Sequence, residues 1–176
     1  MMESSVLKVG RGEDGWICRI EGPGRVRESP AFEKMVDRLL DPAADARLIV
    51  DLSDCEMLDS TFLGCLAALY GRYANGGVPR IVLYAPGDVR QRLFGPSQID
   101  RHLQFRAVPP PSDGEWMEVP ISALDERSLG RHIMEAHKTL AQRGGPLAAA
   151  FAAIAQQFAD ELSGKATIEP GVVTLR

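Results

Sequence analysis

Asp59, Ser60 and Thr61 are the residues whose types and position could best support chemistry. They follow an apolar run at residues 48–52 that contains an acid, a pattern typical of a buried central strand. Helically spaced apolar residues begin just after them, so Asp59 and Ser60 should lie at a helix N-terminus, where both types are preferred caps. A hydroxyl there is near free backbone N–H groups and the positive end of the helix dipole. Gly64, one turn further on, has no side chain, which allows a close approach to this face of the helix. The segment therefore predicts an exposed serine hydroxyl at a helix N-terminus, although Asp-Ser-Thr on its own is more often only a helix cap.

A nucleophilic serine would need a base within reach and an oxyanion hole. The three histidines lie far from Ser60 in the sequence, at His102, His132 and His137. His102 falls in a predicted edge strand, and the other two are expected to be solvated residues of a separate helix. The sequence thus predicts no catalytic residue and no enzymatic activity.

No group of residues has the spacing of a metal or cofactor site. His132, Glu135 and His137 do not form the i, i+4 pair that places two ligands on one helix face. The cysteines are odd in number and lack metal-type spacing, which indicates ordinary reduced thiols: Cys18, Cys55 and Cys65. We expect neither a metal nor a cofactor.

The bulk composition excludes several partners. The chain has 176 residues, is 45% hydrophobic, and carries a net charge of −4 with no basic block, which argues against nucleic-acid binding. No apolar stretch reaches the roughly 20 residues that span a bilayer, and the start has no signal-peptide pattern. These features favour a soluble protein of a bacterial cytoplasm.

The elements that must position Ser60 alternate between strands and helices. Strand patterns occupy residues 6–9, 16–20, 48–52, 80–84 and 102–106, and helical patterns begin at residues 29, 61 and 87. Residues 53–58 are expected to be a loop. The order β-β-α-β-α-β-α-β predicts an α/β domain over residues 5–109. Its sheet should be mixed, with an antiparallel first hairpin and parallel crossovers.

The rest of the chain has the pattern of an appendage. Residues 110–120 are proline-rich at their start and predict a stiff linker. Two apolar stripes at residues 129–140 and 147–162 flank Gly144, Gly145 and Pro146, so residues 121–163 should form an αα-hairpin. The hairpin should bury its stripes on the domain or on another chain, and the second case includes a homodimer. Residues 164–176 are expected to be a tail, with a weak strand pattern at 172–175.

Residues 48–64 have the sequence LIVDLSDCEMLDSTFLG and resemble the phosphorylation motif of the anti-sigma factor antagonist (STAS) family. In that family a strand ending in Asp-Leu leads to an Asp-Ser-Ser/Thr-Gly-Leu-Gly turn. Asp59, Ser60, Leu63 and Gly64 match this turn, whereas Phe62 stands where the family usually has glycine. The stretch at 87–105 is also similar, and the resemblance covers about residues 5–109 without the C-terminal helices.

The resemblance implies a STAS-like mixed sheet with helices packed on it, and a phosphorylation site at Ser60, with Thr61 as second choice. It implies partner contacts through the whole turn, which comprises Asp59, Ser60, Thr61, Phe62, Leu63 and Gly64. The unphosphorylated protein would bind an anti-sigma factor with serine kinase activity, phosphorylation would release it, and a serine phosphatase would reset the switch. ATP and metal would belong to those partners.

A second function stays open at this point. STAS-like domains also serve as structural or regulatory subunits of larger assemblies, such as transporters or stress-sensing complexes, without a dynamic phospho-switch. The appended helical hairpin favours this alternative, because minimal antagonists lack one.

Overall fold

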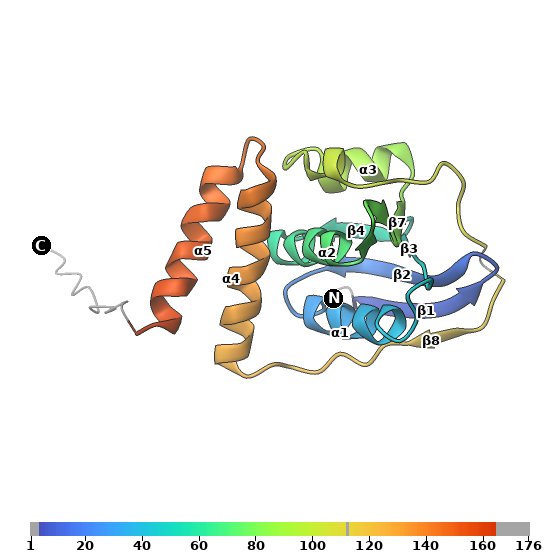
Figure 1. The fold of residues 1–176 in the computed structure, drawn as a ribbon, viewed down its shortest axis with the longest axis horizontal. Helices are drawn as coiled ribbons and strands as arrows, with labels where there is room; N and C mark the ends of the chain where they lie inside the picture. The colour runs from blue at the N-terminus through green and yellow to red at the C-terminus, as the bar shows by residue number, and fades with distance from the viewer. Residues whose placement is uncertain (1–3, 112, 165–176) are drawn as a thin grey trace, which may run out of the picture.

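The computed structural model describes residues 4–111 and 113–164. Its centre is a mixed six-stranded sheet with the order β7-β3-β2-β1-β8, and β4 pairs with the far end of β2 (Figure 1). The strands are β1 (Val6–Gly12), β2 (Gly15–Gly24), β3 (Leu48–Asp51), β4 (Cys55–Leu58), β7 (Ile81–Tyr84) and β8 (Trp116–Glu118). The helices packed with them are α1 (Ser29–Leu40), α2 (Ser60–Arg72) and α3 (Gly87–Phe94). A small hairpin of β5 (Ala74–Asn75) and β6 (Val78–Pro79) turns through Gly76 and Gly77, which both have positive φ.

The predicted pattern of strand directions is confirmed. β1 and β2 pair antiparallel, and β2, β3 and β7 follow one another in parallel. Alternate residues of these strands point to one face and join α1, α2 and α3 in a single apolar cluster, which includes Leu7, Ile20, Val50 and Leu83. This cluster fixes β3 beneath α2 and so determines where the loop that carries Asp59 and Ser60 emerges.

Two of the predicted elements before residue 110 were wrong. Residues 102–106 do not form an edge strand; a 3-10 helix, η1 (Ile99–His102), precedes one isolated bridge between Leu83 and Phe105. Phe105 instead packs edge-on against Phe94, and the guanidinium of Arg90 lies over its ring. The loop predicted at residues 53–58 contains the short strand β4.

The predicted linker at residues 110–120 also differs, because it supplies β8, which pairs antiparallel with β1. Trp116 lies on Gly10, where a Cβ would be 3.1 Å from the indole ring, and the Arg19 guanidinium lies 4.5 Å from the centroid of that ring. These contacts outweigh the weak strand propensity of this proline-flanked segment. The segment therefore belongs to the sheet.

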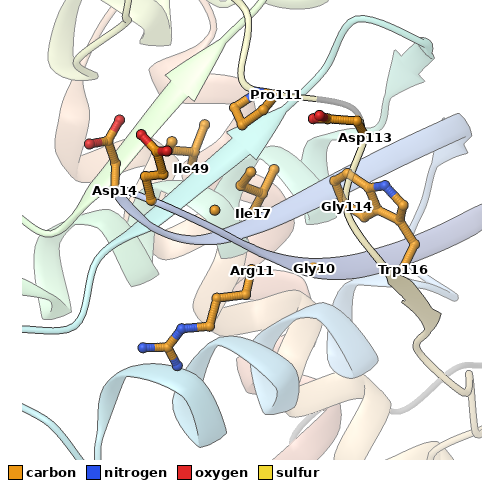
Figure 2. Close-up of a pocket in the computed structure, with 11 residues that line it drawn as sticks. Gly10, Arg11, Asp14, Ile17, Ile49, Pro111, Asp113, Gly114 and Trp116 are labelled. Carbon is orange, nitrogen blue, oxygen red and sulfur yellow. The ribbon is translucent and has the colours of Figure 1, made fainter.

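The sheet face opposite α1 and α2 holds a separate pocket of about 590 Å³ (Figure 2). Ile17 and Ile49 form its floor, with Trp116 and Pro111 beside them (Figure 2). Next to it, Arg19 forms a largely buried ion pair of 2.9 Å with Asp51. Ser60 does not line this pocket, so it plays no part in the candidate site described below.

The C-terminal helices form the predicted αα-hairpin. α4 (Glu126–Arg143) and α5 (Ala148–Leu162) lie side by side at one end of the domain, with α4 between α5 and α2 (Figure 1). Leu140 is fully buried and Phe151 is 8% exposed, and both belong to the main cluster. Half-buried positions of the two stripes are Leu129, Ile133, Ile154 and Phe158. The hairpin is therefore docked on the domain by its own apolar stripes.

None of the helices within residues 4–111 and 113–164 is long and apolar enough to cross a membrane.

The predicted tail from residue 165 onward, with its weak strand pattern at 172–175, lies outside the described residues.

Candidate functional site at the start of helix α2

Asp59 is the N-cap of α2, as the sequence predicts. One carboxylate oxygen, Oδ1, accepts the backbone N–H of Phe62 at 2.8 Å. The other, Oδ2, accepts the backbone N–H of Val26 at 2.6 Å, and the N–H of Asp59 donates to the carbonyl of Gly24. Asp59 thus holds the loop before α1 against the start of α2. Its two oxygens are committed inside the protein, so its main role is to fix the geometry of this corner.

Ser60 is the first residue of α2 and is partly exposed. Its hydroxyl oxygen lies 2.9 Å from Nε2 of His137, on α4. Nδ1 of His137 lies 2.8 Å from the carbonyl oxygen of Ile133, which can only accept. The neutral ring therefore carries its proton on Nδ1, and the Ser60 hydroxyl donates to Nε2.

The expectation that the histidines of the C-terminal helix are solvated was wrong for both, because the side chain of His132 is only 10% exposed and His137 is buried more deeply. It is 3% exposed, and the ring of Phe151 packs against it with a centroid distance of 5.9 Å. The sequence did hold a signal for this: His137 falls in the stripe of Ile133 and Leu140 at helical spacing. A polar residue inside an apolar stripe usually has a buried partner, which here is Ser60.

Gly64 provides the close approach that the sequence predicts, and the approaching element is α4. A Cβ at Gly64 would lie 2.5 Å from the carbonyl carbon of Ala136 and 2.8 Å from its Cα. Further along α2, the Arg143 side chain reaches the carbonyl of Ala67 at 3.4 Å and covers Gly71. The α2 face that begins at Ser60 consists of small residues, and α4 lies along it.

The remaining residues of the motif point inward. Phe62 is fully buried and its ring lies 5.0 Å from that of Phe32 on α1. Thr61 is 5% exposed and Leu63 is 6% exposed. Of the six residues expected to contact a partner, only Asp59 and Ser60 are more than slightly exposed in this conformation. Phe62 occupies the domain core, where it cannot contact a partner.

A second serine–histidine contact lies beside the first. The hydroxyl of Ser29, at the start of α1, lies 3.2 Å from the carbonyl oxygen of Val26, to which it donates, and 2.8 Å from Nε2 of His132. Nδ1 of His132 is 3.2 Å from a carboxylate oxygen of Glu33. The hydrogen bond with His132, and after it the one with Arg72, holds the pKa of Glu33 below its usual value against the opposing effect of burial.

One trio among the described residues could present ligand atoms to a metal: Glu33, Cys65 and His132. Each of the three already has a partner, because the Cys65 thiol points to the carbonyl of Ser29 at 3.6 Å and the other two bind each other. Burial also raises the pKa of the Cys65 thiol well above its usual value, which disfavours the thiolate that a metal requires. We therefore assign no metal to this cluster.

Burial similarly raises the pKa of the other two thiols, Cys18 and Cys55, to about 12. All three cysteines are free and buried. None of them takes part in the Ser60 site.

Comparisons with known proteins support the fold. No protein-family model matches the chain, and no curated protein sequence matches it significantly. Among solved structures, the chain is similar to an anti-sigma factor antagonist from Mycobacterium paratuberculosis, with a TM-score of 0.51 and 21% identity. The match covers 61% of this chain and 90% of the other. With its mixed sheet and its helices on one face, the chain has the STAS-like α/β fold of this neighbour.

Proposed function

We propose that this protein is a regulatory protein-binding module that works as an anti-sigma factor antagonist. In the unphosphorylated form it binds an anti-sigma factor that is also a serine kinase, phosphorylation of Ser60 releases that partner, and a serine phosphatase restores the first form. The observation that carries the proposal is the position of Ser60, a partly exposed hydroxyl at the N-terminus of α2 in a STAS-like fold. Such a cycle belongs in a bacterial cytoplasm.

Exposure supports Ser60 over Thr61 as the acceptor. Thr61 is 5% exposed and lies on the inner side of the first turn, whereas Ser60 is partly exposed. A kinase must bring the hydroxyl oxygen into line with the γ-phosphate of ATP, which requires free space around that oxygen. Ser60 needs the smaller rearrangement to provide it.

The start of α2 is suited to carry a phosphate. A phosphoserine adds about 1.5–2 negative charges and three acceptor oxygens. The free N–H groups and the dipole at a helix N-terminus favour an anion, so the domain itself should change little. A partner packed on this corner would have to bury the charge, which costs several kcal/mol when it is unpaired.

We therefore expect Ser60→Ala to retain the partner and Ser60→Asp to lose it. The loss should reach about 100-fold or more in affinity, equivalent to about 2.7 kcal/mol. Each variant is used as bait in lysate from the source cell, bound proteins are identified by mass spectrometry, and the recovered partner is titrated against both. Thr61→Ala is the matched control and should still be phosphorylated at Ser60 by that partner with ATP. Phosphate found only on Thr61, or equal affinity of the Ala and Asp variants, would contradict the switch.

The contact between Ser60 and His137 raises the question of hydrolysis, because it brings a base within reach of a serine. Two features speak against turnover. Neither Ser60 nor His137 lines any of five pockets on the surface of the described residues. Ala136 also packs directly on Gly64 one turn from Ser60, which leaves little space for an acyl substrate.

We propose accordingly that the protein is not an enzyme. Purified protein should hydrolyse p-nitrophenyl acetate no faster than Ser60→Ala does, and a fluorophosphonate probe should leave Ser60 unlabelled. Turnover that persists through purification and disappears in both Ser60→Ala and His137→Ala would show a working serine–histidine pair instead.

One observation favours a second function. The docked hairpin covers the face of α2 on which a partner would bind. In a structural subunit of a larger assembly this arrangement would be permanent. Capture of the same partners by Ser60→Ala and Ser60→Asp, with no phosphate on Ser60 in the cell, would favour that function.

A further inference from the structure

We propose that α4, backed by α5, is an intramolecular competitor for the surface of α2 that carries Ser60, so that a partner can bind only after α4 moves away. This inference rests on the proposed function, because it concerns the same surface. Movement of α4 would regulate access of the partner to this surface in addition to phosphorylation of Ser60. The occupant of the surface is a segment of this chain, residues 126–143.

The first support is steric. Backbone atoms of Ala136 lie so close to Gly64 that even a methyl group there would overlap them. The contact continues along α2 to Ala67 and Gly71, which Arg143 covers. A partner that packs on Gly64 would need the volume that α4 fills. Both cannot be bound at the same time.

The second support is polar. The Ser60 hydroxyl gives its only proton to Nε2 of His137, and the other ring nitrogen is fixed by the carbonyl of Ile133. The closed position of α4 therefore satisfies the Ser60 hydroxyl inside the protein. A partner that binds this hydroxyl must first break the contact with His137.

The third support is the way the hairpin is fastened. Leu140 and Phe151 join the domain core, while Leu129, Ile133, Ile154 and Phe158 are only half-buried. The hairpin is held by a few buried side chains, which is the kind of unit that opens locally. If about 1% of molecules are open, the apparent affinity for a partner falls about 100-fold, and a change that opens α4 restores it.

The test uses the full-length chain and a cysteine introduced at position 60 as a probe of access. In Ser60→Cys, the rate of reaction of the new thiol with iodoacetamide is followed by peptide mass spectrometry and divided by the rate in concentrated urea. The three native thiols are buried and give a low background. Ser122→Cys, in the exposed loop before α4, is the reference for a free site.

The decisive comparison adds Ala136→Leu to Ser60→Cys. Ala136 is buried where α4 meets α2, so a larger side chain there pushes α4 away. We expect the thiol at position 60 to react at least about tenfold more slowly than the thiol at position 122, and Ala136→Leu to raise its rate by about tenfold or more. Lys138→Leu is the matched control, since it adds the same side chain at an exposed position of the same helix, and it should leave the rate unchanged. The rates are compared only at temperatures at which circular dichroism shows that every variant is folded. His137→Ala, which removes the bond to Ser60 without added bulk, should act in the same direction if Ala136→Leu does not fold.

The outcomes separate this inference from the proposed function. Equal reaction rates at positions 60 and 122 in the chain that keeps Ala136 would show that α4 covers nothing. If Ala136→Leu exposes position 60 but leaves the affinity for the recovered partner unchanged, α4 is no competitor and the inference fails while the function stands. If position 60 becomes exposed and no anti-sigma factor binds any variant, α4 is a cover and the proposed function fails.

Discussion

Phe62→Ala should lower the free energy of unfolding by about 3–5 kcal/mol. The side chain is fully buried, and its ring contacts that of Phe32 at a centroid distance of 5.0 Å. Removing it loses the transfer free energy of a large apolar group and leaves a cavity between α1 and α2 that neighbours fill only in part. The measurement is urea unfolding followed by circular dichroism.

Phe158→Ala is the matched control for this substitution. It removes the same side chain from a half-buried position on α5, so its cost should be clearly smaller. Phe62→Gly, which restores the residue usual in the family, should cost about 1 kcal/mol more than Phe62→Ala because glycine disfavours a helix. A loss below about 1 kcal/mol for Phe62→Ala would mean that the ring is not part of the core and is free to meet a partner.

Leu140→Ala should lower the free energy of unfolding of the hairpin by about 2–5 kcal/mol. Leu140 is fully buried and joins α4 to the same apolar cluster that underlies the sheet. Because the cost falls on the docking of α4, amide hydrogen exchange in residues 126–162 should speed up more than exchange in β2 and β3. Hydrogen exchange with mass spectrometry measures both regions in one experiment.

Leu147→Ala is the control in the same hairpin. Leu147 is 38% exposed in the turn between α4 and α5, so the same truncation should change exchange little. Uniform acceleration over the whole chain in Leu140→Ala would show that α4 and the domain unfold as one unit. In that event the cover could not open separately, and partner binding would require another surface.

Phe62 and Leu140 hold opposite sides of α2, one against α1 and the other through α4. Phe62 faces inward and fastens α2 to α1, whereas Ser60 and Gly64 face α4. A large residue at position 62 therefore does not narrow the surface that a partner would use. In this protein, α4 is the element that covers that surface and restricts access to it.

The sequence by itself determined the α/β class and the position of the candidate site. Alternation of apolar runs specified β1, β2, β3 and β7, and cap residues placed Ser60 at the start of a helix. The stripes around Gly144 and Gly145 specified the hairpin of α4 and α5. These features depend on local propensity and periodicity, which neighbouring residues carry.

Tertiary structure alone decided what covers the site. His137 and Ser60 are 77 positions apart, and a pattern of neighbours along the chain cannot state which distant hydroxyl a buried histidine will meet. In the same way, the segment that contains Trp116 has the composition of a linker and yet joins the sheet. The indole ring of Trp116 packs on Gly10, which has no side chain, and the Arg19 guanidinium lies over the ring. Gly64 could be recognised from the sequence as a point of close approach. That the approaching surface is the chain's own α4 follows only from packing, because burial of Leu140 and Phe151 selects one docking position among those that the stripes permit.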